Sequence, residues 1–473
     1  AVPRIRVLDE QEEEMVHEYS VRSLNDIGVL IRSKSVLQML EEAGAMVDYD
    51  KWIAKFPEDM VNDALKNAPK RFKLCAREPR NDLEIPVNSG IPHISTDGLT
   101  IYMKDLETGE RKDALRADLA NFAKVADALD AVKFFWPIVT VRDAPEEAHA
   151  VHEMWTSLNG CSMHVQGMCL NKKDALTEIE LASLIVGGKE ELKKRPIFSI
   201  IHCSIAPLSF EKGLTEAHVE LARAGIPVVS MSMSLSGMSC PVTFAATVVN
   251  INTENLASLI ITQSAEPGAP HIYCSESAPV DMVTGNMNYT APEMLSVSAA
   301  AGQMARRYGI PSMVGSWGIG GELGPEDTNL SLLAGSFMRV FSNTDLTCGF
   351  GGMDSALGCS MEQMVIDANE WEDFSAFLKS YKFSEEQIAL DVVKEVGHGN
   401  SFLTHPHTAK RFKSELYLPN KNRLLKSTTM SNTIYSEAKE VVKKLLREHE
   451  VPEIDATVVR QGDQIIAEYE KTL

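Results

Sequence analysis

The 473-residue chain is 44% hydrophobic and 24% charged, proportions typical of a globular protein with a sizeable core. Its formal net charge of −20 argues against nucleic acid and anionic membrane as partners, because both bind basic faces. No stretch approaches the ~18 consecutive apolar residues of a membrane span. The eight cysteines are scattered without a C-x-x-C pair, and the charged start does not resemble a signal peptide, so we expect a cytoplasmic protein with reduced thiols.

The first 90 residues are expected to form helices and a small β region. Apolar residues recur at helical spacing in 35–40 and 59–67. Short β segments are predicted at 72–77 and 82–87, and a further one at 100–106 turns toward Lys112.

From there, short apolar or β-branched runs alternate with helical patterns. The expected strands are 93–95, 132–136, 162–168, 196–201, 227–231, 271–274, 311–314 and 345–348. The main expected helices are 118–129, 145–158, 174–185, 214–224, 241–263, 292–308 and 326–341. Eight strand-then-helix units predict an α/β fold, a closed (βα)8 or TIM barrel. The alternative, a doubly wound open sheet, would carry a glycine-rich dinucleotide turn after an early strand, and no such turn is present.

These patterns divide the chain into three parts. Residues 1–90 form an extension packed on the barrel, 91–380 form the barrel, and 381–473 form a C-terminal helical extension. Within the last part, 431–449 and 455–472 are charged, amphipathic segments. Their apolar faces are expected to pack on the barrel or on a neighbouring subunit, so a homo-oligomer is predicted.

Candidate site residues are those that follow strand ends, because TIM barrels carry their reactive groups there. The seventh loop is rich in glycine and contains Trp317 and Glu322, and the eighth contains Phe350 and Asp354. Neither loop contains Lys or Arg, so a phosphate site is disfavoured, and aromatic residues beside acids favour a cation. Plain core packing of each aromatic stays open. The other candidates after strand ends are Asp97, Trp136, Gln166, His202 and Glu276.

A small number of groups could serve an anionic end of a ligand. His202 is the preferred candidate, with Gln166 or the backbone amides of 349–352 as alternatives. Adjacent strand residues face opposite sides, so only one of His202 and Cys203 can line the cavity. No metal site is predicted: His405 and His407 lie beyond the barrel without a third ligand at suitable spacing.

Three segments carry a resemblance to the trimethylamine methyltransferase family. They are TDGLTIYMKDLETGERKDALRADLANFAKVADALD, PSMVGSWGIGGELGPED and NTDLTCGFGGMDSALGCSMEQMVIDAN. The resemblance extends from about residue 10 to about residue 455. It implies transfer of a methyl group from a methylamine to cobalt in a partner corrinoid protein. It also implies that the glycines of the last two loops face the corrinoid; these are Gly318, Gly320, Gly321, Gly349, Gly351 and Gly352.

The chain departs from the founding members of that family, which carry pyrrolysine in the seventh-strand loop. Here the loop holds standard residues only, with Trp317 near the expected place. This departure indicates the non-pyrrolysine branch, which is similar to glycine betaine methyltransferases of anaerobic bacteria. A quaternary ammonium leaves as a neutral amine without a proton donor, which fits a site with few acid–base groups. The catalytic role is not assigned among Glu276, Glu322 and Asp354.

The expected activity is therefore demethylation of a quaternary amine, most simply glycine betaine to dimethylglycine. Proline betaine and carnitine carry the same methylated cation and stay open as substrates. The chain lacks the D-x-H-x-x-G cobalt-ligand pattern of corrinoid carriers, so no permanently bound cofactor is expected and the cobalamin is expected on a separate protein. Two other classes stay open, a barrel isomerase or lyase acting on a small carboxylated metabolite and a quaternary-amine binding protein.

Overall fold

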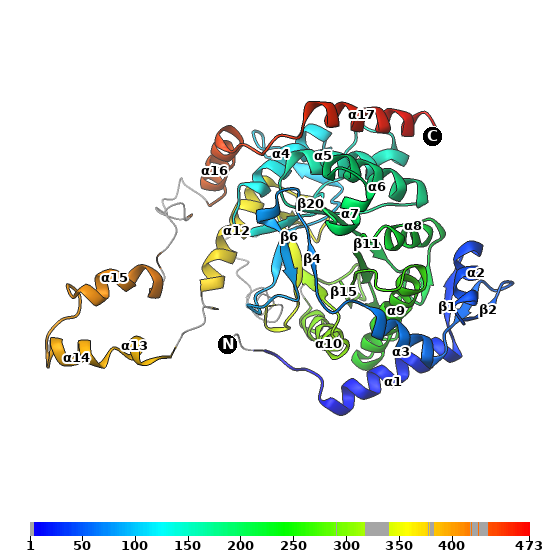
Figure 1. The fold of residues 1–473 in the computed structure, drawn as a ribbon, viewed down its shortest axis with the longest axis horizontal. Coiled ribbons are helices and arrows are strands. Elements are labelled where there is room, and N and C mark those ends of the chain that lie inside the picture. Colours follow the sequence, from blue (N-terminus) through cyan, green and yellow to red (C-terminus); the bar gives the residue numbers. More distant parts are fainter. Residues whose placement is uncertain are drawn as a thin grey trace.

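Eight parallel strands close into a barrel that forms the centre of the molecule (Figure 1). The computed structural model describes residues 4–289, 291–316, 340–376, 378, 383–416, 418, 424 and 434–473. The barrel strands are β6 (His93–Thr96), β9 (Val132–Phe135), β10 (His164–Gly167), β11 (Phe198–Cys203), β13 (Val228–Ser232), β15 (His271–Ser275), β17 (Ser312–Ser316) and β18 (Leu346–Phe350). The sheet closes where β18 pairs with β6 and β6 with β9, so the predicted TIM barrel is confirmed.

Helices cover the outside of the barrel, as the apolar stripes in the sequence predict. They are α4 (Arg116–Asp127), α5 (His149–Gly160), α6 (Lys172–Val186), α7 (Lys189–Lys194), α8 (Lys212–Arg223), α9 (Phe244–Ala265), α10 (Pro292–Tyr308) and α12 (Met361–Ala376), with the short 3-10 turn η2 (Glu146–Ala148) before α5. The predicted helix 326–341 lies almost entirely outside the described residues. Of the helices described here, α7 and α12 were not predicted.

The N-terminal region contains a sheet that the sequence did not predict. The helices α1 (Glu10–Asp26), α2 (Lys34–Glu42) and α3 (Glu58–Asn67) alternate with three short strands. Those strands, β1 (Val29–Ile31), β2 (Met46–Asp48) and β3 (Ile53–Lys55), join β12 (Ser209–Phe210) in a four-stranded sheet of order β12-β1-β3-β2. Its apolar residues pack on α9 and α10, so this region is anchored to the barrel wall.

A hairpin plugs one end of the barrel. Its strands are β4 (Phe72–Leu74) and β5 (Leu83–Ile85), separated by the 3-10 turn η1 (Pro79–Asn81). Leu74 and Ile85 are fully buried and belong to the same apolar cluster as the inward-facing Phe134 and Ile201. Val87, just after β5, donates its backbone N–H to Asp345, the residue before β18, at 2.8 Å. The hairpin therefore fills the N-terminal end of the barrel, and the carboxyl ends of the strands lie at the opposite end.

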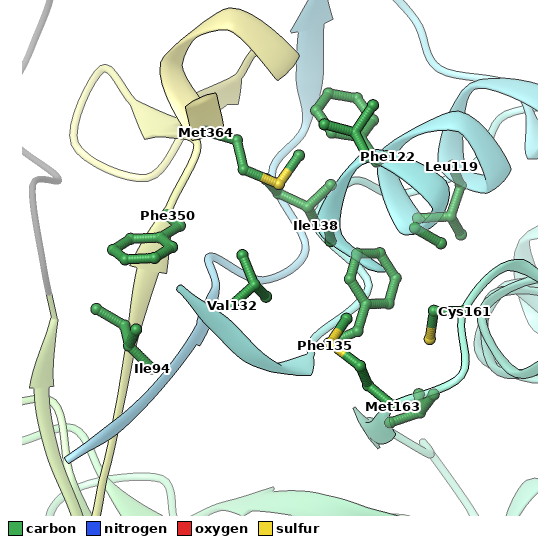
Figure 2. Packing of buried hydrophobic residues seen from close by; sticks show 14 of the residues in the cluster. Ile94, Leu119, Phe122, Val132, Phe135, Ile138, Cys161, Met163, Phe350 and Met364 are labelled. Atoms are coloured by element: carbon green, nitrogen blue, oxygen red, sulfur yellow. The ribbon is translucent and has the colours of Figure 1, made fainter. Parts of the chain in front are cut away.

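A second apolar cluster lies between the strands and the outer helices. Figure 2 shows Ile94, Val132 and Phe350 of the barrel facing Met364 and its neighbours rather than the barrel interior. Next to this cluster, β7 (Tyr102–Lys104), β8 (Arg111–Lys112), β19 (Gly352–Met353) and β20 (Gly358–Cys359) form a small sheet. A two-stranded pair, β14 (Leu235–Ser236) and β16 (Ala278–Pro279), extends from the loops after β13 and β15.

The C-terminal part contains five described helices. The helices α16 (Ile434–Glu448) and α17 (Ala456–Glu470) match the two predicted amphipathic segments and pack on the barrel helices. The other three, α13 (Glu385–Ile388), α14 (Leu390–Val396) and α15 (Pro406–Glu415), stand away from the barrel in Figure 1. Among the helices of the described residues, none is long and apolar enough to cross a membrane.

Candidate functional site

A polar layer lies inside the barrel at the carboxyl ends of three neighbouring strands. The register pairs Ser95 of β6 with Phe134 of β9, which also pairs with His164 of β10. Two residues further along each strand stand Asp97, Trp136 and Gln166, so these three predicted side chains lie level with one another. Trp136 belongs to the inward-facing apolar cluster, and the amide of Gln166 donates to the sulfur of Met313 across the barrel at 3.6 Å.

Asp97 is the most strongly perturbed group of this layer. Its side chain is 4% exposed, and its Oδ2 has no hydrogen-bond partner among the described residues. Burial raises the pKa of Asp97 to about 7, the negative charge of Glu276 acts in the same direction, and the Gly98 N–H opposes both. The carboxyl is therefore a buried hydrogen-bonding group that changes its charge near neutral pH.

Glycines make room for this carboxyl and for the adjacent indole. A methyl group added at Gly352 would lie 2.2 Å from Asp97 Oδ2, and one added at Gly98 would lie 2.0 Å from the Trp136 ring. Both distances are too short for any side chain, so these backbones lie directly against the two groups. The backbone of Gly352 thus bounds the Asp97 carboxyl, and the backbone of Gly98 bounds the Trp136 ring.

Trp136 and Gln166 each add one further buried atom without a hydrogen-bond partner among the described residues. These atoms are Trp136 Nε1 and Gln166 Oε1. A buried polar group without a partner costs about 1–3 kcal/mol, and such atoms in a native structure call for an explanation. Together with Asp97 Oδ2, they place two acceptors and one donor in a single layer, an arrangement suited to a small polar ligand.

Glu276, Ser316 and Tyr289 complete the described part of the layer. The Ser316 hydroxyl donates to Glu276 Oε1 at 2.7 Å. Tyr289 lies in the loop between β16 and α10, and burial together with the charges of Glu276 and Asp97 raises the pKa of its hydroxyl. Neither Ser316 nor Tyr289 was predicted from the sequence. Ser316 ends a strand that the sequence placed two residues too short, and Tyr289 follows its strand by more than ten residues.

The position of His202 corrects its predicted role. The strand β11 continues to Cys203, two residues beyond the predicted end, so His202 lies within the strand and faces outward. Its ring stacks on Phe210, and its Nδ1 lies 3.2 Å from His218 Nδ1 on α8. Burial lowers the pKa of His202 to about 4, so the ring is neutral at ordinary pH. It is a packing residue between strand and helix and does not reach the barrel interior.

Phe350 and Asp354 also lie away from the layer. Phe350 packs edge to face with Trp371 of α12, at 6.4 Å between ring centres, on the outer side of the barrel. Asp354 is partly exposed and accepts hydrogen bonds from Tyr102 at 3.0 Å and from Arg111 at 3.2 Å. The predictions that Phe350 faces a bound cation and that Asp354 acts at the site are therefore wrong for this arrangement.

Two register shifts explain why the direction of the Phe350 and Ser316 side chains does not follow from strand alternation. Leu346 and Cys348 face the interior, and strict alternation would turn Phe350 inward as well. The pairing of β18 shifts between Thr347 and Phe350, where Gly349 has a φ of 121°, and the alternation reverses. In β17 a similar shift accompanies Gly315, with a φ of 68°, and brings the Ser316 hydroxyl to Glu276.

The remaining predicted residues divide between the eighth loop and the seventh. In the eighth loop, Gly352 lies against Asp97, while the Gly351 N–H donates to Asp367 on α12 and is not open to a ligand. Predictions for the seventh loop fall outside the described residues; they concern Trp317, Gly318, Gly320, Gly321 and Glu322.

Other features of the described part of the chain do not form a competing site. A cleft of about 750 Å³ is lined by the helices α4, α5 and α17 on the outside of the barrel. Polar groups of this cleft already bond to protein groups, for example His152 Nε2 to Glu470 Oε1 at 2.8 Å. Within the described ranges, no group of three or more His, Cys, Asp and Glu side chains is arranged to hold a metal ion. All eight cysteines are free.

A closed parallel barrel with a buried polar layer at the carboxyl ends of its strands defines a TIM-barrel protein with its candidate site in the usual place. The chain belongs to the trimethylamine methyltransferase (MTTB) family, whose sequence profile matches residues 1–472.

Curated relatives agree with this assignment. The chain is 28% identical over 467 residues to the trimethylamine methyltransferase MttB of Methanosarcina barkeri, with 96% of this chain and 93% of the relative covered. It is 28% identical over 424 residues to the glycine betaine methyltransferase of Desulfitobacterium hafniense, with 88% and 87% covered. The crystal structure of the monomethylamine methyltransferase MtmB of Methanosarcina barkeri superposes with a TM-score of 0.57 at 12% identity, covering 95% of this chain and 89% of that one, a likeness in fold.

Proposed function

We propose that this protein transfers a methyl group from a quaternary amine to Co(I) of a corrinoid carried by a separate partner protein. Glycine betaine, which would yield dimethylglycine, is the first candidate substrate. Family membership and the similarity to a glycine betaine methyltransferase support methyl transfer. The observation that carries the proposal is a pair of buried atoms in one layer of the barrel, Asp97 Oδ2 and Trp136 Nε1, neither of which has a hydrogen-bond partner among the described residues.

These two atoms are complementary to a zwitterion. Asp97 and Glu276, whose charges act on each other, form the acidic side of the layer. This side suits a quaternary ammonium, which has no N–H and is held by charge and by aromatic faces. The Trp136 indole, in the same layer of the barrel, offers such a face. Among the described residues, the Trp136 N–H has no acceptor and the Gln166 amide N–H contacts only the thioether of Met313. Both can donate to a ligand carboxylate, the role predicted for His202.

The proposed reaction needs no general acid or general base from these residues. The corrinoid Co(I) supplies the nucleophile as a co-substrate. The bond between the methyl carbon and nitrogen breaks, its electron pair stays on nitrogen, and a neutral tertiary amine leaves. No proton is transferred, so the protein acts by fixing the ammonium and excluding water. The hairpin that fills the opposite end of the barrel leaves the strand carboxyl ends as the side from which the acceptor approaches.

The test is formation of methylcobalamin from cob(I)alamin, followed spectroscopically, with a panel of amines. Glycine betaine, proline betaine and carnitine are compared with trimethylamine, whose leaving group needs activation. We expect demethylation of at least one quaternary amine and none of trimethylamine. Asp97→Asn should lower the rate about tenfold or more, the equivalent of ~1.4 kcal/mol. The control Asp26→Asn removes an exposed carboxylate paired with Arg22 on α1 and should keep the wild-type rate. Equal rates on trimethylamine and betaine, or no loss in Asp97→Asn, would contradict the proposal.

A further inference from the structure

A helical arm, residues 383–416, stands away from the barrel (Figure 1). It consists of α13, α14 and α15, with 4, 7 and 10 residues respectively. None of these three helices contains a buried residue. Helices this short are marginal in water unless an apolar face packs against another element, so the arm needs a surface that covers it.

Exposed apolar side chains are concentrated on this arm and the residue just beyond it. Of the 25 large hydrophobic residues that are exposed in the described chain, eight lie between 383 and 418. They are Phe383 91%, Ile388 61%, Leu390 71%, Val393 50%, Phe402 40%, Leu403 79%, Leu416 61% and Leu418 50% exposed. About a third of the exposed large hydrophobic residues thus lie in one short segment. Such a concentration is typical of an interface and not of a solvated tail.

Contacts within the arm do not replace this cover. Arg411 of α15 forms an ion pair with Glu386 of α13, and the ring of His405, which precedes α15, lies 3.4 Å from Glu395 of α14. The acidic partners are 77% and 73% exposed. Exposed ion pairs contribute little to stability, and these set the relative position of the helices without covering their apolar side chains.

The charges of the arm are separated along it. The α13–α14 half carries four acids, Glu385, Glu386, Asp391 and Glu395, and a single base, Lys394. The α15 half carries Lys410, Arg411 and Lys413 against Glu415 alone. An acidic half followed by a basic half is self-complementary: a second arm turned by a twofold axis sets its basic half against the acidic half of the first.

We propose that the arms of two copies of this chain pack against each other about a twofold axis and hold the protein as a dimer. Eight side chains of about 150 Å² each, exposed by nearly two thirds on average, offer about 700 Å² per copy. If all eight side chains of each arm are covered by the other, two arms together bury about 1,400 Å², within the ~1,200–2,000 Å² of specific, stable interfaces. A permanent second copy accounts for an apolar surface that every molecule exposes.

The experiment compares the full-length protein with a variant in which Leu390→Asp and Leu403→Asp place two charges in the proposed contact. Its matched control, Met15→Asp with Tyr19→Asp, places the same charges at two apolar residues of α1 that are 55% and 49% exposed. Mass photometry at nanomolar concentration and analytical ultracentrifugation at micromolar concentration give the oligomeric state. We expect a dimer for wild type and control, and a dissociation constant raised by about 100-fold or more in the arm variant, since the charges would lie in a desolvated contact.

Hydrogen exchange separates this contact from its rivals. In the wild-type dimer, amides of 385–415 should be protected in proportion to the dimer fraction, and in the arm variant they should exchange as fast as in an unfolded chain. A wild-type protein that is monomeric throughout overturns the proposal, and so does a dimer that survives in the arm variant. Arm protection that does not depend on concentration would mean that the arm packs on its own barrel. New protection on the barrel surface upon dimerisation would mean that it packs on the partner's body.

Discussion

The buried carboxyl of Asp97 makes a prediction about the ligand-free protein that does not depend on any substrate. Replacing Asp97 by Asn keeps the shape of the side chain and removes its charge. In the folded protein the pKa of Asp97 is about 7, against 3.8 for an unperturbed aspartate. We therefore expect Asp97→Asn to stabilise the protein at alkaline pH.

The sign and the size follow from proton linkage. Below pH 3.8 the carboxyl is protonated in both states and costs nothing. Between 3.8 and 7 the unfolded chain loses its proton while the folded chain keeps it, so wild-type stability falls as pH rises through this window. Above pH 7 the full difference applies, and at 1.36 kcal/mol per pKa unit it amounts to about 4 kcal/mol. A cost of this size in a ligand-free site is consistent with a group retained for binding rather than for folding.

The assay is denaturant unfolding of wild type and Asp97→Asn at pH 5 and pH 8, with Asp26→Asn as the exposed control. The free energy of unfolding of Asp97→Asn should exceed that of wild type by several kcal/mol at pH 8, and by clearly less at pH 5. The control should follow wild type at both values. A difference between variant and wild type that stays constant with pH would refute the assignment of a buried carboxyl titrating near neutrality.

Four further predictions concern ligand binding and packing. Binding of a quaternary amine beside Asp97 should release about half a proton at pH 7, visible as a buffer-dependent calorimetric enthalpy; release that is zero, or equal in Asp97→Asn, would contradict a contact with this carboxyl. Trp136→Phe removes the unpartnered N–H and should weaken glycine betaine by about 1–3 kcal/mol, while a quaternary amine without a carboxylate keeps its dissociation constant. His202→Ala should lower the unfolding free energy by about 2 kcal/mol and leave betaine affinity unchanged, since the ring packs outside the barrel; a selective loss of affinity would restore its predicted role. Trp317→Leu should weaken glycine betaine by about 0.5–2 kcal/mol but spare a neutral tert-butyl isostere, and equal weakening of both ligands would identify Trp317 as packing.

The barrel could be predicted because each strand is a short apolar run followed by a helical stripe, and these two periods differ clearly. All eight strands lie within a few residues of their expected positions. The N-terminal sheet could not be predicted in the same way. Its strands β1, β2 and β3 have three residues each, and so few residues show neither alternation nor a distinct composition.

The candidate site was predicted where the expected end of the strand lies within one residue of the observed end. Asp97, Trp136, Gln166 and Glu276 satisfy that condition, and all four lie in or beside the polar layer. His202 failed because an error of two residues in the strand end changes a loop residue into a strand residue with a fixed direction. The direction of a side chain at the site therefore depends on the exact residue at which the strand ends. The two-residue period of the strand does not reveal that residue.

The two glycines at the ends of β17 and β18 connect the irregular backbone to the chemistry. If β18 alternated regularly past Cys348, the Phe350 ring would enter the barrel close to the Asp97 carboxyl, because Asp97 N–H bonds the Phe350 carbonyl at 2.9 Å. The positive φ of Gly349 turns that ring outward to Trp371 and brings the bare backbone of Gly352 against Asp97 instead. A β-branched or bulky residue at position 349 would resist that φ. The space around the Asp97 carboxyl therefore depends on a backbone feature that only a glycine maintains at low cost, and this explains the presence of glycine in the eighth loop from this chain alone.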